Sequence, residues 1–219
     1  MYSRPRSFNF RFIPPNLSHQ AFHPRSISQM RSQKPQLLVV GLGNLPLPGT
    51  RHSLGHLVVD ALASRLGISL STERKGISGG GLVTIGKTPV QLTLFKSKSA
   101  MNISGPSIAE IFRHSVKHAN ALIVLQDSMS HRSEVLSARL GGSANGHNGI
   151  KSIINALGGK QDFHRFRLGI GERGGADAAV YVMGRLSSHE RQFWQEEGLD
   201  QVLEELEKVA ITIESIDSG

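Results

Sequence analysis

A set of polar side chains suited to proton transfer stands in loops beside the ends of short apolar runs. The set consists of Asn44, His52, Asn102, Asp127, His147 and Asn148. A histidine held by a carboxylate is a common general base, and asparagine amides can hold a water or stabilise a developing negative charge. Each residue alone also fits a cap or turn, so the prediction depends on their joint presence. The chemistry indicated is hydrolysis by an activated water, with no metal and no covalent intermediate.

The first of these residues lie between an expected strand and an expected helix. Residues 37–40 are apolar and partly β-branched and end at Gly41, which is typical of a strand buried on both faces. Glycines and prolines crowd the loop that follows. Apolar side chains then recur at helical spacing over residues 54–66, and Gly67 is the expected stop. His52 is therefore predicted at the carboxyl end of a strand, where α/β sheets bind ligands.

The rest of the chain predicts alternating strands and helices. Strands are expected over residues 82–85, 90–95, 121–127, 134–140 and 166–171, with a turn at 86–89. Helices are expected over residues 104–118, 150–157 and 188–209. The strand over 121–127 places Asp127 at its carboxyl end. This alternation predicts an α/β fold with a largely parallel or mixed sheet.

Composition excludes several classes of protein. The chain has 219 residues, enough for one domain with a substantial core. Cysteine is absent, which excludes disulfides, thiolate chemistry and Cys-ligated zinc. No apolar run approaches the roughly 18 residues of a membrane-spanning helix, so no membrane association is expected.

Basic charge is concentrated in the first 35 residues. This segment holds several arginines, one lysine and no acidic residue, and it is rich in serine and proline; the first acidic residue is Asp60. Such a leader is typical of a mitochondrial transit peptide, and the alternative is a basic tail on a cytosolic protein. We therefore expect a leader over 1–35, one domain over 36–210 and a short tail over 211–219.

Several familiar motifs match the sequence only in part, and these partial matches do not support the corresponding functions. Gly41 and Gly43 follow a strand as in dinucleotide-binding proteins, but Pro46 occupies the third glycine position. His52 and His56 are four residues apart, as zinc ligands can be, yet the glutamate of a zinc protease and a third ligand are missing. His56 is therefore interpreted as a packing or capping residue. Serine-hydrolase and phosphate-loop motifs are also absent from the sequence.

Ordered motifs along the chain resemble one family. They read GLGN…TRHSLGH, AMNISG, LQD, RLGGSANGHNGIKSII and DFHRFRLGIG. Together, from about residue 36 to about residue 206, they resemble the bacterial-type peptidyl-tRNA hydrolases. The resemblance implies a single α/β domain with a twisted mixed sheet flanked by helices, acting as a monomer without cofactor or metal. The implied reaction is cleavage of the ester between a peptide and the 3′ ribose of tRNA.

The resemblance also implies roles for residues at matching positions. His52 corresponds to the catalytic base and Asp127 to its carboxylate partner. The expected substrate-binding positions are Asn44, near the tRNA 3′ end, and Met101, Asn102, His147 and Asn148. Of these, Asn102 is expected to place the peptide backbone and the water, and Asn148 to hold the water or the oxyanion.

The resemblance further implies that Arg139 and Arg167 clamp the 5′ phosphate of tRNA. Arginine suits this task because its fork of donors matches phosphate oxygens without reading base sequence.

The chain departs from the family pattern near the 3′-end site. The loop between Asn44 and His52 is shorter and lacks the family's tyrosine, Ser53 replaces a common asparagine, and Ala100 replaces a bulky residue. These departures concern the stacking of the terminal adenosine or the peptide side chain and suggest a eukaryotic, organellar member. A catalytically silent RNA-binding member of the same fold and an unrelated small-molecule hydrolase are the alternative interpretations.

Overall fold

The computed structural model describes residues 34–217. The predicted leader over 1–35 lies outside this part of the chain, except for its last two residues.

A seven-stranded mixed sheet, in the order β2-β3-β4-β1-β5-β7-β6, forms the centre of the molecule. Its strands are β1 (Gln36–Gly41), β2 (Ser71–Thr72), β3 (Gly76–Ile85), β4 (Thr88–Ser97), β5 (Leu122–Ser128), β6 (Leu136–Leu140) and β7 (His164–Gly169). The inner strands β4, β1, β5 and β7 pair in parallel, whereas β2, β3 and β6 pair antiparallel to their neighbours. The predicted α/β class with a mixed, largely parallel sheet is confirmed.

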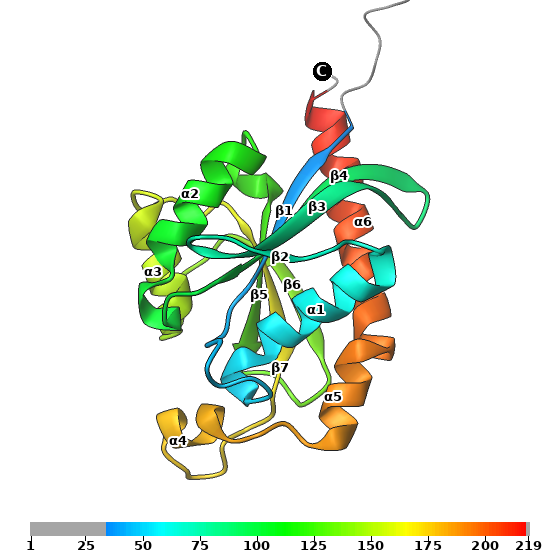
Figure 1. The fold of residues 1–219 in the computed structure, drawn as a ribbon. Coiled ribbons are helices and arrows are strands. Elements are labelled where there is room, and N and C mark those ends of the chain that lie inside the picture. The colour runs from blue at the N-terminus through cyan, green and yellow to red at the C-terminus, as the bar shows by residue number, and fades with distance from the viewer. Residues whose placement is uncertain (1–33, 218–219) are drawn as a thin grey trace, which may run out of the picture. The chain divides into compact units, whose positions relative to one another are not determined.

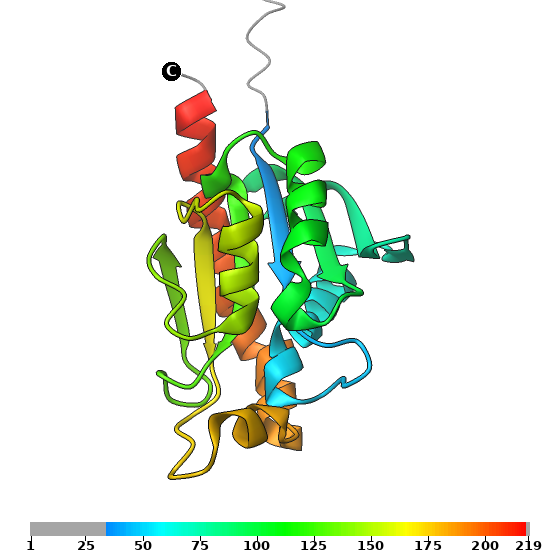
Figure 2. The same cartoon turned by 90° about the vertical axis from the view of Figure 1, so that its left-hand side faces the viewer.

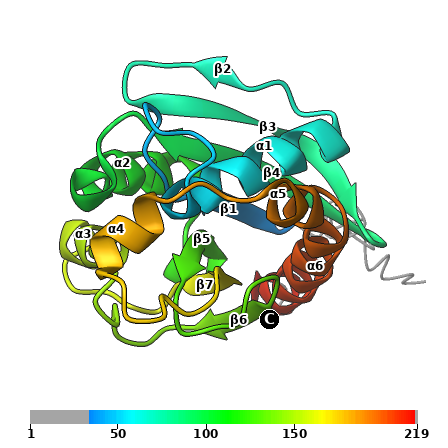
Figure 3. The same cartoon turned by 90° about the horizontal axis from the view of Figure 1, so that it is seen from below.

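Helices cover both faces of the sheet (Figures 1 and 2). They are α1 (Leu54–Leu66), α2 (Gly105–Ser115), α3 (Asn148–Ala156), α4 (Ala178–Met183), α5 (Ser188–Gln195) and α6 (Glu197–Asp217). Helices α2 and α3 lie over one face, and α1, α5 and α6 lie over the other, as the view along the strands shows (Figure 3). The short α4 lies below the carboxyl ends of β1, β5 and β7 (Figure 1).

The core forms where these layers meet. Every residue of β5 is buried, and so is β1 after its first residue. This agrees with the apolar runs in the sequence, because a parallel strand covered on both faces needs apolar side chains on both. The carboxyl ends of these two strands lie side by side; Asp127 lies at the end of β5, and Asn44 lies in the loop after β1.

Close backbone contact fixes the start of α1 against β1 and β5. A Cβ added at Gly55 would lie 2.5 Å from the carbonyl oxygen of Leu125, and one at Gly41 would lie 2.3 Å from that of Gly55. Side chains at these positions would push the helix away from the sheet. The short 3-10 turn η1 (Arg51–Ser53), which holds His52, directly precedes this contact.

Two predicted helix boundaries differ from the structure. The segment expected as one helix over 188–209 is two helices, with non-helical backbone at Glu196. Helix α6 then continues to Asp217, with Ile213 buried. The tail expected over 211–219 is therefore wrong for residues 211–217, because the helical spacing of apolar side chains continues past residue 210.

Other differences concern glycine-rich or short segments. Strand β3 starts at Gly76, six residues before the expected strand, because its glycines pair with β4 through the backbone. Helix α2 ends at Ser115, short of residue 118, and α4 was not predicted. Among the described helices, none is both long and apolar enough to cross a membrane.

The glycine contact gives a first prediction. Gly55→Ala should lower the free energy of unfolding by about 1–3 kcal/mol, because the new methyl group has no space beside the Leu125 carbonyl. Denaturant unfolding measures the change. Gly81→Ala is the control, since nothing lies near a Cβ there, and it should change stability by less than about 0.5 kcal/mol. Equal effects of the two substitutions would contradict the close packing of α1.

Candidate active site

His52 and Asp127 meet at the carboxyl edge of the sheet, as predicted. The distance from His52 Nδ1 to Asp127 Oδ1 is 3.0 Å. His52 comes from η1 after β1, and Asp127 from the end of β5. With Nδ1 donating to the carboxylate, the ring nitrogen Nε2 carries the lone pair and is available to take a proton.

His147 is the second donor to the same carboxylate oxygen. Its Nε2 lies 3.1 Å from Asp127 Oδ1, and its Nδ1 accepts the backbone N–H of Ile150 at 3.4 Å. This second contact makes His147 the N-cap of α3 and fixes the tautomer, since Nδ1 must be unprotonated to accept. His147 was predicted to bind substrate, and the structure gives its ring the further task of holding Asp127.

Asp127 is held as a carboxylate inside the protein. Only 4% of the residue is exposed. Burial by itself raises the pKa of this carboxyl, but the hydrogen bonds from His147 and His52 outweigh it and hold the pKa well below its ordinary value. A negative charge therefore stays next to His52, where it stabilises the imidazolium that forms when the ring takes a proton.

These three residues are also the one described group that has the donors for a metal ion. The arrangement fits hydrogen bonds better than coordination. Zinc–nitrogen bonds measure about 2.0–2.1 Å and need the lone pair of each imidazole, whereas His147 Nε2 carries a proton in the tautomer set by Ile150.

Asn44 joins two loops of the site. Its side-chain Oδ1 accepts the N–H of Met101 at 2.9 Å, and its own N–H donates to Ser53 Oγ at 3.0 Å. Met101 is buried at the start of a second 3-10 turn, η2 (Met101–Ile103). Ser53, which differs from the family pattern, thus joins the two ends of the shortened loop through its hydroxyl group.

The predicted residues line two adjoining spaces. A cavity of about 470 Å³ is lined by His52, Asp127, His147, Asn148 and Arg167, among others. A neighbouring groove runs between η2 and α3 and is lined by Asn102, Asn148 and Lys151. Asn148 borders both spaces and so links the side of His52 with the side of Asn102. Asn44 and Met101, which are hydrogen-bonded to each other, line neither space.

Arginines gather on one face of the two strands beside the cavity. In the pairing of β6 with β7, Arg139 lies opposite Arg165, and Ser137 lies opposite Arg167. Arg167 donates to Ser137 Oγ at 2.7 Å, and Arg139 is exposed on the edge strand. The two predicted phosphate-binding residues therefore share a basic face.

The sequence reasoning missed Arg165. It is 1% exposed, and its guanidinium donates to the carbonyl oxygens of Gly141, at 2.6 Å, and Ser143. Burial first, and then repulsion from Arg167 and Arg139, lowers the pKa of Arg165. It fixes the glycine-rich loop that leads to His147. The available signal was its spacing of two residues from Arg167, which puts both on one face of a strand.

Comparison with known proteins identifies the family of the chain. The sequence profile of the family described as "Peptidyl-tRNA hydrolase" matches residues 38–216. The chain belongs to the peptidyl-tRNA hydrolase family. Among its relatives, the peptidyl-tRNA hydrolase of Agathobacter rectalis is 39% identical over 159 residues, which cover 70% of this chain and 83% of the relative. That of Mycolicibacterium smegmatis is 36% identical over 161 residues, covering 71% and 81%.

Solved structures of the same family share the fold. A peptidyl-tRNA hydrolase from Acinetobacter baumannii superposes with a TM-score of 0.70 at 28% identity, covering 84% of this chain and 93% of that one. The Arg119Gln mutant of the enzyme from that organism gives 0.69 at 29% identity, covering 84% and 92%. The family profile, which matches up to residue 216, includes nearly all of α6.

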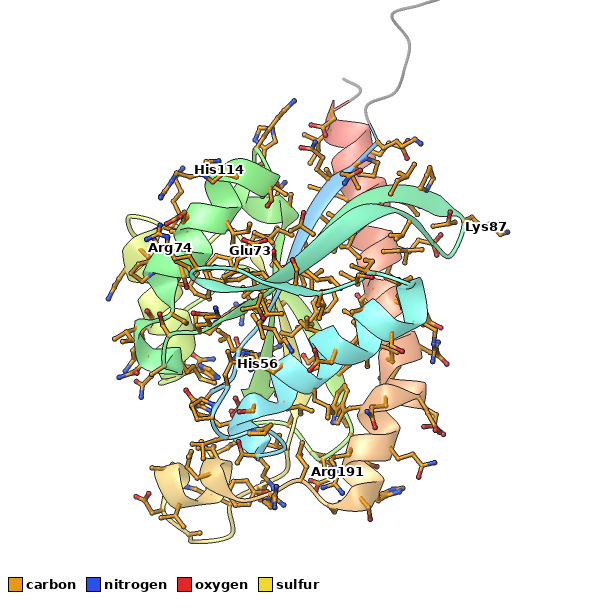
Figure 4. All side chains as sticks on the ribbon, in the orientation of Figure 1. His56, Glu73, Arg74, Lys87, His114 and Arg191 are labelled. Carbon is orange, nitrogen blue, oxygen red and sulfur yellow. The ribbon has the colours of Figure 1, made fainter. Side chains whose placement is uncertain are left out.

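In this member of the peptidyl-tRNA hydrolase family, His56 packs inside the protein, as predicted. It lies one helical turn after His52, is 6% exposed, and its Nε2 has no hydrogen-bond partner among the described residues (Figure 4). Burial, followed by the nearby charge of Lys96, lowers the pKa of His56 to about 3. His56 is therefore neutral in the folded protein at any pH at which the enzyme would work.

His56 predicts a pH dependence of stability. The unfolded chain binds a proton at His56 below about pH 6.5 and the folded chain only below about 3, so stability falls as pH is lowered between them, by up to about 1.4 kcal/mol per pH unit. Denaturant unfolding between pH 7 and pH 4 should show a shallower dependence for His56→Gln than for wild type. His114→Gln, on the exposed surface of α2, should leave the slope unchanged. If the free energy of unfolding depends on pH with the same slope in wild type, His56→Gln and His114→Gln, then His56 does not take up a proton on unfolding.

Proposed function

We propose that the chain hydrolyses the ester between the peptide and the tRNA 3′ ribose with a water activated by His52. The observation that carries this proposal is the contact of His52 Nδ1 with the buried Asp127 carboxylate at 3.0 Å. Family membership supports the reaction, and the contact supports the assignment of the base. A catalytically silent member has no need to keep such a buried charge pair beside an open cavity.

The proposed steps follow from the tautomer of His52. Its Nε2 removes a proton from water as the oxygen attacks the ester carbonyl carbon, and the carbonyl oxygen takes on negative charge. When the carbon–oxygen bond to the ribose breaks, the imidazolium returns the proton to the leaving ribose oxygen. Asp127 lowers the energy of the imidazolium between these steps.

We assign the oxyanion and the peptide to the asparagines. Asn148, exposed at the first turn of α3, borders both the cavity of His52 and the neighbouring groove. Its amide can donate to the carbonyl oxygen as charge develops there. Asn102, in the groove, can bond the peptide backbone on the acyl side.

The basic face is proposed to hold tRNA phosphates. Arg139 and Arg167 project from paired strands beside the cavity, which suits a clamp on the 5′ phosphate. One chain supplies His52 and Asp127 as well as Arg139 and Arg167, which supports action as a monomer.

The basic, acid-free composition of residues 1–35 supports one further proposal, import into mitochondria. Residues 1–35 fused to a fluorescent protein should co-localise with a mitochondrial marker. A diffuse cytosolic signal would favour the basic-tail interpretation.

The base assignment predicts the effect of removing His52. His52→Ala should lower turnover of N-acetyl-aminoacyl-tRNA by roughly 10²–10⁴-fold, the usual range for loss of a general base. Peptide release is measured in the presence of a chelator, which also tests the proposed independence from metal. His114→Ala, on the surface of α2, is the matched control and should keep wild-type turnover. Near-normal turnover by His52→Ala, or loss of wild-type activity in chelator, would contradict the mechanism.

The phosphate clamp predicts a change in salt dependence. Arg139→Ala and Arg167→Ala should each weaken tRNA binding and lower the slope of log K against log salt by about 1, because each removes one phosphate contact. Lys87→Ala, in the β3–β4 turn away from the site, is the charge-matched control (Figure 4). If Arg139→Ala and Arg167→Ala keep the wild-type slope of log K against log salt, these two arginines do not bind a tRNA phosphate.

A further inference from the structure

Arg51, in the motif that carries His52, has no part in the proposed reaction. It comes directly before His52 in the turn η1, yet of the two only His52 lines the cavity. The side chain of Arg51 is 21% exposed and contacts α4 and α5 instead. A role for Arg51 must therefore lie in these contacts.

Helix α4, which Arg51 contacts, forms a wall of the cavity that contains His52. Its residues in this wall are Ala178, Ala179, Val182 and Met183. The helix has six residues, and Val182 is its one buried residue. Because so short a helix is not stable by itself in water, the place of this wall depends on the contacts that α4 makes with the rest of the protein.

Backbone hydrogen bonds join the segment after α4 to the turn of His52. The N–H of Arg51 donates to the carbonyl oxygen of Gly184 at 2.9 Å, and the N–H of Leu186 donates to that of Gly49 at 2.9 Å. The two segments form an isolated antiparallel bridge, and the chain from α4 to α5 runs below the start of α1 (Figure 1). The end of the cavity wall and the proposed base therefore meet at one junction.

The side chain of Arg51 adds a second layer of contacts to this junction. Its guanidinium lies over the ring of Tyr181, with Cζ 4.8 Å from the ring centroid, which is an attractive cation–π contact. The Tyr181 hydroxyl donates to the carbonyl oxygen of Ile170 at 2.6 Å, which fixes the ring. Arg51 Nη2 lies 3.7 Å from Oε2 of Glu190 in α5. One side chain thus bridges α4 and α5.

The guanidinium fits closely into this place. A Cβ at Gly184 would lie 2.8 Å from Arg51 Nη1, so a side chain there would displace the guanidinium. Arg51 Nε is buried and has no hydrogen-bond partner among the described residues. Arginine normally uses its donors when it is buried, so stacking on the tyrosine ring is a main part of what Arg51 contributes here.

We propose that Arg51 is a positioning residue for the hydrolysis, which fastens α4 to the turn of His52 and so fixes the base relative to the α4 wall of its cavity. This inference rests on the proposed function, in which His52 activates the water. Arg51 acts through Tyr181 and touches neither the substrate nor the water. A displacement of about 1 Å in an active site can slow a reaction by roughly 10²-fold, so loosening α4 should slow cleavage.

Binding of a tRNA phosphate is a poorer explanation of Arg51. A phosphate-binding arginine needs guanidinium donors that face solvent and no acid beside them. The guanidinium of Arg51 is stacked on a ring, and the nearby carboxylate of Glu190, whose side chain is 12% exposed, would repel a phosphate. Substitution of Arg51 should therefore change the cleavage step and not the affinity for tRNA.

The first test breaks the stack from either side. Arg51→Ala and Tyr181→Leu should each slow single-turnover cleavage of bound N-acetyl-aminoacyl-tRNA by about tenfold and leave the Kd for tRNA within about twofold of wild type. The double variant should be no slower than the slower single variant, because both substitutions remove the same contact. Tyr181→Phe keeps the ring and should restore most of the rate that Tyr181→Leu loses.

Gly184→Ala breaks the stack without changing Arg51, and it decides the proposal if Arg51→Ala does not fold. Its methyl group displaces the guanidinium, while φ of −63° and ψ of 150° at this position suit alanine. It should slow cleavage as Arg51→Ala does and have no further effect in the Arg51→Ala background. Arg65→Ala, which removes an exposed ion pair with Asp200 on the far part of α1, is the matched control and should keep the wild-type rate.

Hydrogen exchange tests the junction without any substrate. The buried N–H of Leu186 is bonded to Gly49, so it exchanges with solvent when the junction opens. Its exchange should be about tenfold faster in Arg51→Ala than in wild type, since the cation–π contact is lost. In Arg65→Ala it should be unchanged.

The outcomes separate this proposal from the function. If wild type cleaves the substrate and Arg51→Ala cleaves it equally fast, or loses only affinity for tRNA, the positioning role is wrong and the hydrolase mechanism stands. If wild type does not cleave, the proposed function fails, and hydrogen exchange decides whether Arg51 fastens α4. Faster exchange of the Leu186 N–H in Arg51→Ala supports that contact, and equal exchange overturns it.

Discussion

The site depends on one buried oxygen atom, Oδ1 of Asp127, which faces two imidazoles. His52 and His147 reach it from different loops, at 3.0 and 3.1 Å. A buried charge is costly unless it is paired and hydrogen-bonded, so these two contacts are what makes a carboxylate tolerable at the end of β5. The same contacts fix both ring tautomers. The interactions that stabilise the charge of Asp127 therefore also orient His52, the proposed base.

Close packing brings the partners of this oxygen together. The contact of Gly55 with the Leu125 carbonyl presses the start of α1 against the sheet, and His52 stands one turn before it. On the other side, Arg165 holds the loop before α3 through the carbonyls of Gly141 and Ser143. Substitutions at Gly55 or Arg165 should therefore shift His52 or His147, the two residues that donate to Asp127.

The sequence predicted what depends on local pattern. Apolar runs located β1 and β5, and Gly67 correctly marked the end of α1, where it adopts the left-handed conformation. Local sequence pattern did not predict features that depend on contacts between distant segments. The first half of β3 is rich in glycine and forms a strand by pairing with β4, and Arg165 shares a face with Arg139 only through the register of β6 and β7. The motifs named the polar residues, but not the second hydrogen bond of His147, which depends on the fold of the loop before α3.

The most direct test of the account concerns the charge at Asp127. Single-turnover cleavage of bound N-acetyl-aminoacyl-tRNA should be measured for wild type and for Asp127→Asn, together with the Kd for tRNA. The amide keeps the shape of the side chain but not the charge that stabilises the His52 imidazolium. The cleavage step should slow by at least roughly 10²-fold, with the Kd unchanged. A near-wild-type cleavage rate in Asp127→Asn would show that His52 does not act as a base held by this carboxylate.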